Sequence, residues 1–378
     1  MKKKDQKDFS QGSVLANIIR LAIPMTLAQL INVLYNIVDR IYIGHIPGIG
    51  GAALTGVGLF TPILMLITAF AMLAGAGGAP RAAIAMGQGN KDKAEQILGN
   101  CFSVLMILAV ILTAGFWFAA PVLLRFFGGS DATLPYALVY GRIYILGSVF
   151  VLIVMGMNTF ITTQGFAKFS MLTTVIGAVI NLILDPIFIF MLDMGVAGAS
   201  LATAISKVVS FSILIFPYLT HRSMLHLSIR NFHFSRDIMK EIVSVGSSSM
   251  FRNGLAVVAG ILLNDLAGNI SASVLAGVGV CTKIMMFPFS IILGFGSGFQ
   301  PVAGFNWGAK RYDRVRESYR FSSKVALWGG VIMAVILIFS ADPLIVLFAG
   351  TDAEMRRIGV ICMISQCIAL PVHGWVAI

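Results

Sequence analysis

The sequence predicts an all-α polytopic membrane protein with two homologous lobes of six helices each, about ten of whose twelve spans lie within the 378 residues. Three observations lead to this fold class. Hydrophobic residues make up 58% of the chain and charged residues 11%, whereas soluble proteins carry about 25% charged residues. Apolar runs of about 20 residues, long enough to cross a bilayer, recur along the chain. Finally, the sequence repeats itself at one fixed offset.

The first apolar run follows a basic segment, MKKKDQKDFSQGS. This run is longer than the apolar region of a signal peptide and has no A-x-A cleavage pattern, so we expect it to remain as a span. The four cysteines fall within spans without metal or redox spacing, and we expect no cofactor. The expected spans in chain order lie near 15–38, 52–76, 94–118, 134–157, 168–190, 196–218, 238–262, 272–298, 318–340 and 356–378.

Positive charge alternates between the gaps that separate these spans. The N-terminus and every second gap after it are rich in Lys and Arg, as in the run from Lys310 to Lys324, whereas the gaps between hold few. The positive-inside rule therefore places the N-terminus in the cytoplasm of a multi-pass cell-membrane protein. The net charge of +11 sets this orientation, and we expect the lipid bilayer as a partner, with no nucleic acid and no obligate protein partner.

The repeat appears when the chain is shifted by 221 positions. Leu54 to Gly58 then aligns with Leu275 to Gly279, and further pairs follow downstream: Pro80 with Pro301, Gly87 with Gly308 and Asp92 with Asp313. One offset that joins loops and spans alike indicates duplication. Since six spans separate equivalent points, both copies run the same way, and an axis along the membrane normal should relate the two halves.

The same offset predicts that the second half lacks two spans. The counterpart of span 168–190 would begin near 389 and that of Asp185 would be residue 406, both beyond the last residue. An unpaired half-bundle would expose polar interhelical surface to lipid, so we expect a fragment of a longer protein rather than a natural truncation. The expected domains are an N-terminal lobe at 1–218, a cytoplasmic linker at 219–240 and an incomplete C-terminal lobe at 241–378.

Two carboxylates within the apolar runs are the first candidates for function. Asp39 and Asp185 would each cost roughly 2.5–3.5 kcal/mol at the centre of a span, so chains retain such groups mainly where they act. Asn181 lies one helical turn before Asp185 on the same face, and both side chains offer oxygen ligands. Pro186 predicts a kink and a hinge beside them. We predict that the two acids bind and release a coupling cation.

Simpler interpretations of these acids stay open. Asp185 could make only an interhelical hydrogen bond, and Asp39 could end its span as an interfacial pair with Arg40. Three basic residues, Lys207, Arg252 and Lys283, also fall within spans and would disfavour cationic cargo if they faced a cavity unpaired. The linker histidines are spaced in a loop without acidic partners close by, which favours a solvated basic linker over a metal site: His221, His226 and His233.

Four segments carry a family resemblance: LYNIVDRIYIG, ALTGVG, NLILDPIFIF and GFQPVAGFNWGAKRYDRVR. With them the chain resembles the bacterial MATE transporters, the multidrug and toxic compound extrusion family, over essentially its whole length. The resemblance implies twelve spans in two lobes and efflux of amphiphilic, often cationic compounds in exchange for H⁺ or Na⁺. It places the cation site on Asp39, Asn181, Asp185 and Thr203. Where some members carry an acid in span 7, this chain has Arg252 and Asn253.

For the cargo cavity we name five candidates: Tyr35, Asn158, Arg252, Lys283 and Met286. We expect a transporter and not an enzyme, since the Gly-x-Gly-Asp context of an intramembrane aspartyl protease is absent. The sequence also has no Gly-rich phosphate-binding loop, so we do not expect ATP-driven transport. The alternative that remains open is a flippase for a lipid-linked precursor, in which Arg252 and Lys283 would bind a phosphate.

Overall fold

The computed structural model describes residues 9–220, 223–227, 235–349 and 352–378. All regular secondary structure in these ranges is helical, and ten helices are long and apolar enough to cross a membrane. The ten helices match the ten expected spans in number, which confirms that prediction. The elements are α1 (Val14–Gly44), α2 (Gly50–Gly87), α3 (Lys91–Phe126), α4 (Leu134–Thr163), α5 (Ala167–Pro186), a π-helical turn η2 (Ile187–Met191), α6 (Gly195–Leu219), α7 (Arg236–Ile270), α8 (Ala272–Gly308), α9 (Tyr312–Phe339), α10 (Ala341–Ala349) and α11 (Ala353–Val376).

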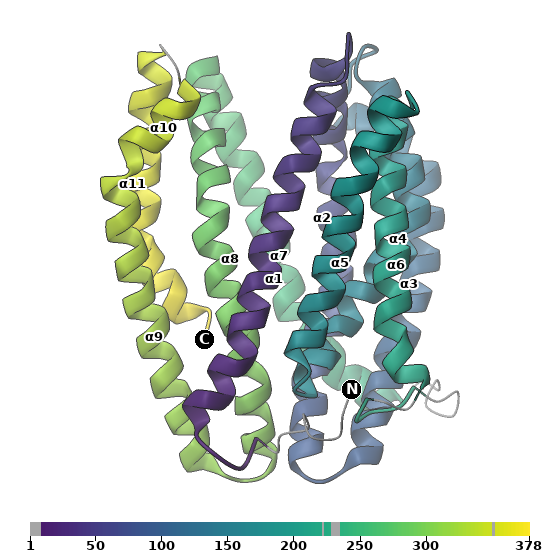
Figure 1. Cartoon of the computed structure of the whole chain (residues 1–378), viewed down its shortest axis with the longest axis vertical. Helices are drawn as coiled ribbons and strands as arrows, with labels where there is room; N and C mark the ends of the chain where they lie inside the picture. Colours follow the sequence, from purple (N-terminus) through teal and green to yellow (C-terminus); the bar gives the residue numbers. More distant parts are fainter. Residues whose placement is uncertain (1–8, 221–222, 228–234, 350–351) are drawn as a thin grey trace.

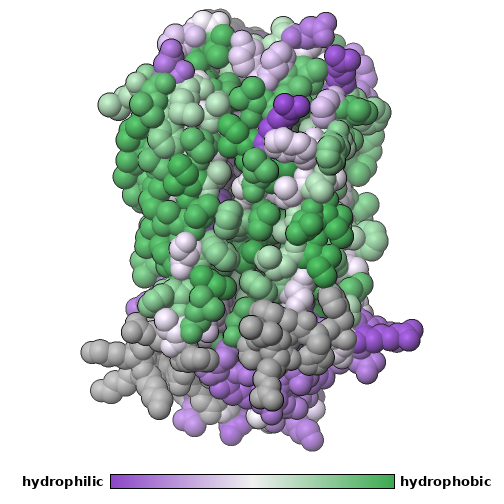
Figure 2. All heavy atoms as spheres, turned by 90° about the vertical axis from the view of Figure 1, so that its right-hand side faces the viewer, coloured by the Kyte–Doolittle hydropathy of each residue, from purple (hydrophilic) through white to green (hydrophobic). Residues whose placement is uncertain are grey.

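Several helices begin where a polar side chain caps the first turn. The Ser13 hydroxyl accepts the Ala16 amide at the start of α1, and the Asn90 side chain accepts the Lys93 amide at the start of α3. Such caps satisfy donors that the helix leaves open. The apolar runs place large hydrophobic side chains on the outside of the helices. Phe118 and Val122, for example, are 79% and 72% exposed. Figure 2 shows such side chains as an apolar belt between hydrophilic ends, as expected for a protein that spans a bilayer.

The helices form two lobes, α1–α6 and α7–α11 (Figure 1). Within the first lobe α4 packs on α2, α3 and α6, while α5 packs on α1 and α6. Within the second, α11 packs on α8 and α9. The lobes meet where α1 crosses α8 and where α2 crosses α7 and α8. Two hydrophobic cores continue across these crossings, one where Ile18 and Leu21 of α1 pack with Phe299 and Val302 of α8, and one where Ile242 of α7 joins the core of the first lobe.

The crossing of α2 with α8 repeats at the offset seen in the sequence. A Cβ atom at Gly87 would fall on the backbone carbonyl of Phe305, and one at Gly308 would fall on that of Ile84. Ile84 and Phe305 are themselves 221 positions apart. Reciprocal contacts of this kind arise when two like units meet across a two-fold axis. The geometry thus agrees with two parallel repeats.

The other crossings between the lobes also depend on glycines that leave no room for a side chain, and they lie in one half of the bundle. Gly246 of α7 leaves no room for a Cβ against Leu73 of α2, and Gly294 of α8 leaves none against Thr26 of α1. These contacts involve the halves of the four helices next to the end where α1 begins (Figure 1). We call this the basic end, because the Lys- and Arg-rich gaps lie there. The lobes are closely joined at the basic end.

Most helices run past the predicted spans, and α2 does so by the widest margin, to Gly87 instead of residue 76. α1 runs on to Gly44, well past the expected end at residue 38. α7 begins at Arg236, so the last residues of the predicted linker 219–240 are helical. The counterpart of α3 is broken at Ser340 into α9 and a short helix, α10, that we did not predict. Pro343 lies in the first turn of α10, a position that suits proline, whereas α3 runs without a break through Pro121.

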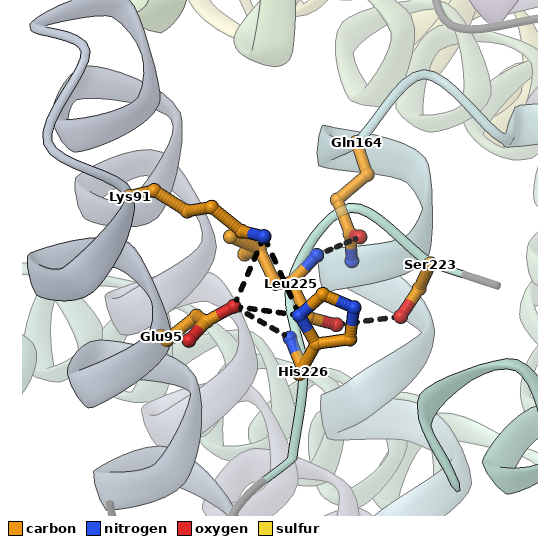
Figure 3. A network of polar contacts seen from close by, with 6 residues as sticks. All are labelled: Lys91, Glu95, Gln164, Ser223, Leu225 and His226. Atoms are coloured by element: carbon orange, nitrogen blue, oxygen red, sulfur yellow. Dashed lines mark hydrogen bonds and ion pairs between the residues drawn. The ribbon is translucent and has the colours of Figure 1, made fainter. Parts of the chain in front are cut away.

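The described part of the linker is attached to the first lobe (Figure 3). The Leu225 amide donates to Gln164 at 2.9 Å, and the His226 amide donates to Glu95 at 3.1 Å. The His226 ring also lies 2.9 Å from Glu95, which Lys91 approaches to 3.5 Å. The expectation that His226 has no acidic partner is therefore wrong, because Glu95 is distant in sequence but adjacent in the fold. The other two linker histidines lie outside the described residues: His221 and His233.

Candidate functional site

The predicted coupling residues on α5 and α6 form one hydrogen-bonded cluster. Asn181 and Asp185 lie a turn apart on the buried face of α5, with 1% and 0% of their surface exposed, and Thr203 of α6 is 7% exposed. The Asn181 amide nitrogen lies 3.3 Å from a carboxylate oxygen of Asp185 and 3.3 Å from the Thr203 hydroxyl. Helical spacing and the packing of α5 on α6 place these groups together.

Asp39 completes the group from α1, which packs on α5. Its side chain is 8% exposed, and its carboxyl group lies close enough to that of Asp185 to interact directly. The neighbouring Arg40 guanidinium instead lies 3.4 Å from the Thr61 hydroxyl of α2. Since α1 continues to Gly44, the helix does not end at this pair, and the depth of Asp39 in the membrane stays a prediction.

Three oxygens of this cluster are buried without a hydrogen-bond partner: Asp39 Oδ1, Asn181 Oδ1 and Asp185 Oδ2. An unsatisfied buried polar atom costs about 1–3 kcal/mol, and more when it is charged. Hard cations bind through carboxylate and amide oxygens, and a proton would turn one carboxyl oxygen into a donor. The cluster therefore has the chemistry to hold either a small monovalent cation or a proton.

The backbone changes its geometry next to Asp185. α5 ends at Pro186 and continues without interruption as η2, where the Leu192 amide donates to the Ile187 carbonyl at 2.9 Å. Proline has no amide hydrogen to continue the α-helical pattern, and π-helical turns are common at functional sites. α6 packs tightly here, since a Cβ at Gly198 would lie 2.7 Å from the Phe188 backbone. Pro186 thus marks a break in the helix, and its role as a hinge stays a prediction.

An aromatic cluster that was not predicted lies beside Asp39. Tyr140 and Tyr144 of α4 stack with ring centroids 6.0 Å apart, and Phe60 of α2 meets both rings edge-on. Both tyrosines lie within electrostatic range of Asp39. A signal was present, because Tyr140 and Tyr144 have the same one-turn spacing as Asn181 and Asp185.

A second missed contact joins α6 to α1. The Lys207 ammonium lies 3.4 Å from the Tyr35 hydroxyl and 5.3 Å from the centre of the Tyr35 ring. Tyr35 precedes Asp39 by one turn on α1, and Lys207 follows Thr203 by one turn on α6. The pair therefore lies about 6 Å from the coupling cluster along the helix axes, toward the basic end.

The other cargo-cavity candidates are not gathered around this cluster. Asn158 of α4 hydrogen-bonds to α5, to the Ser170 carbonyl and the Thr173 hydroxyl, both at 3.4 Å. The remaining three lie in the second lobe and are exposed: Arg252 on α7, and Lys283 and Met286 on α8. No contact described in the structure joins them to Asp39 or Asp185.

Comparison with known proteins identifies the family. The family model MatE matches residues 24–187 and 249–375, which cover both lobes. The chain belongs to the MatE family. Multidrug export protein MepA of Staphylococcus saprophyticus is 26% identical over 352 residues, 93% of this chain and 75% of that protein. MepA of a Staphylococcus aureus strain is 24% identical over 381 residues, 99% of this chain and 82% of that protein.

Solved MATE structures share the fold. An outward-facing multidrug resistance MATE family transporter of the MOP superfamily superimposes with a TM-score of 0.87 at 28% identity, over 99% of this chain and 82% of that chain. A MOP superfamily transporter from Pyrococcus furiosus, described as having a binding pocket of reverse polarity, gives 0.88 at 27% identity over the same shares. The protein is therefore a multi-pass membrane protein of a transporter family with two lobes.

Proposed function

We propose that this MatE-family protein exports amphiphilic, often cationic compounds across the cell membrane in exchange for H⁺ or Na⁺. The observation that carries the proposal is the set of unpartnered buried oxygens on Asp39, Asn181 and Asp185. Thr203, held 3.3 Å from the Asn181 amide, completes the proposed site for the entering cation. The printed names of the staphylococcal relatives, multidrug export proteins, support the cargo class.

The proposed orientation places the basic end in the cytoplasm, as the distribution of Lys and Arg requires. The close crossings of α2 with α7 and α8 then seal the cytoplasmic half of the junction between the lobes. This is the arrangement expected of a state that releases cargo outward. In this state the coupling cluster lies in the outer half of the first lobe, since α1 and α5 both end a few residues after their acids.

Coupling follows from the electrostatics of the cluster. Two charged carboxylates in a space closed to water repel each other and lose hydration, and a bound cation offsets both effects. The charged and titratable groups around them are Arg40 and Tyr35 on α1, Tyr140 and Tyr144 on α4, and Lys207 on α6. We infer that cation binding shifts the first lobe toward a narrower cavity, with Pro186 and Gly195 as bending points, so that cation and cargo compete.

Transport by the purified protein in lipid vesicles tests this function. We expect accumulation of a cationic dye when either a proton gradient or a sodium gradient is imposed, and none without a gradient. The gradient that drives uptake identifies the coupling ion. Dye movement that ignores both gradients, together with translocation of a fluorescent polyprenyl-phosphate lipid, would favour the flippase alternative.

A further inference from the structure

The membrane-embedded ammonium of Lys207 has no acidic partner. Among the described residues no carboxylate oxygen lies within 4.0 Å of its Nζ, and the described ion pairs all lie elsewhere. Its contacts are the hydroxyl and the ring of Tyr35. A lysine ammonium has three donors, so a single neutral hydroxyl at 3.4 Å leaves most of its hydrogen-bonding capacity unused.

The position of this ammonium favours a ligand contact over a structural one. α1 packs mainly on α5 and α8 and makes few contacts with α6, so the half-buried Lys207 side chain bridges two helices that hardly touch. An unpaired charge within a span is costly and is retained chiefly where it faces a cavity or a substrate path. The arrangement adds an aromatic surface, Tyr35, directly below a cation.

We infer that Lys207 is a specificity-determining residue that binds the anionic group of amphiphilic cargo. A carboxylate placed on the Lys207 ammonium would rest beside the Tyr35 ring, about 6 Å along the helix axes from the Asp39 and Asp185 carboxylates. Cargo with a cationic end and a carboxylate thus finds a partner for each charge. The favoured class is the amphiphilic zwitterion, rather than the same molecule with its acid esterified.

This inference rests on the proposed export function, and it refines the cargo class. When a cation occupies the coupling cluster, the negative partner of the cargo ammonium is neutralised while Lys207 keeps its charge. The Lys207 ammonium then repels purely cationic cargo, whereas zwitterionic cargo keeps the contact of its carboxylate with Lys207. The carboxylate preference should therefore depend on Lys207 and be separate from the coupling reaction.

Equilibrium binding of two matched dyes to the purified protein in detergent tests the inference, with rhodamine B as the free carboxylate and its methyl ester as the cation. We expect rhodamine B to bind about tenfold more tightly, the scale of one charge-assisted hydrogen bond. Lys207→Met should remove that preference by weakening rhodamine B without weakening the ester, and Lys207→Arg should keep it. Lys168→Met, at an exposed lysine at the start of α5, serves as the matched control and should also keep it.

Several outcomes would overturn the inference. They are equal affinity for both dyes in the unmodified protein, tighter binding of the ester, no binding of either dye, or a parallel loss of both dyes in Lys207→Met, which indicates a structural role. Because no ion gradient is present, failure here is distinct from failure of gradient-driven export.

Discussion

At the residue scale, Asp185 is the group on which cation exchange should depend most. Asp185→Asn keeps the shape of the side chain and removes its charge, so we expect insertion and expression to be unchanged while gradient-driven dye transport is lost. Asp193→Asn is a matched control, since Asp193 is an exposed acid with a φ of 51°, a conformation that asparagine also tolerates. Unchanged transport by Asp185→Asn at normal protein levels would exclude this role.

Asp39 tests the competition between cation and cargo. Lowering the pH or raising the sodium concentration loads the carboxylates and removes the negative charge that attracts a cargo ammonium. We therefore expect cargo affinity in detergent to fall in both titrations. Asp39→Asn should resemble the loaded state, with weak binding that no longer responds to pH. Cargo affinity independent of both pH and sodium in the unmodified protein would refute the mechanism.

Helical spacing and depth in the membrane were enough to predict which residues meet on α5. Asn181 and Asp185 lie on one face because four residues make about one turn, and Thr203 and Asp39 joined them through the family resemblance. Spacing on single helices could not predict the pairing of Lys207 with Tyr35, or that of His226 with Glu95. Those contacts depend on how separate helices pack, which no local pattern contains.

At the element scale, the crossing of α7 with α2 depends on one glycine. A Cβ at Gly246 would fall on the Leu73 carbonyl, whereas Gly260 on the same helix has open space around it. Gly246→Ala should push the helices apart and destabilise the protein by about 1–3 kcal/mol, as overpacking does. Gly260→Ala should be neutral or stabilising by up to about 1 kcal/mol through helix propensity.

Thermal unfolding in detergent measures the loss of stability in Gly246→Ala. Spin labels on Asp92→Cys and Asp313→Cys, at the starts of α3 and α9, measure the separation of the lobes, since a loosened crossing should lengthen the distance between the labels. If Gly246→Ala matched Gly260→Ala in both measurements, the close crossing would not hold the basic end shut.

The elements themselves were predicted well where the sequence is apolar and less well at their ends. Most helices extend past their apolar runs because charged and polar residues at the membrane surface continue the hydrogen-bonding pattern, as in α1 to Gly44 and α8 to Gly308. The short α10 was missed because its nine residues fell in the gap between the predicted spans 318–340 and 356–378 and are too few to cross a membrane. There the bidentate contact of Arg356 with Asp342, at 2.7 and 2.6 Å, joins α10 to α11, and it holds the pKa of the exposed Asp342 carboxyl below its usual value.

At the scale of the whole molecule, the two halves should share one orientation in the membrane. Equivalent points are six helices apart, as α3 and α9 are, so Asp92 and Asp313 should lie on the same side. In a variant without the four native cysteines, Asp92→Cys and Asp313→Cys should react with an impermeant maleimide only from the cytoplasm, and Asp131→Cys only from outside. Labelling of Asp92→Cys and Asp313→Cys from opposite sides would mean inverted halves.

The choice of these positions follows from the structure. Gly87 and Gly308 are also equivalent, but each is pressed against the backbone of the other repeat, so a cysteine there would disturb the junction that is being tested. Asp92 and Asp313 are exposed and lie in the first turns of their helices, where a label changes little. If both are labelled from the cytoplasm, the basic end lies inside, and the sealed half of the junction faces the side from which cargo enters.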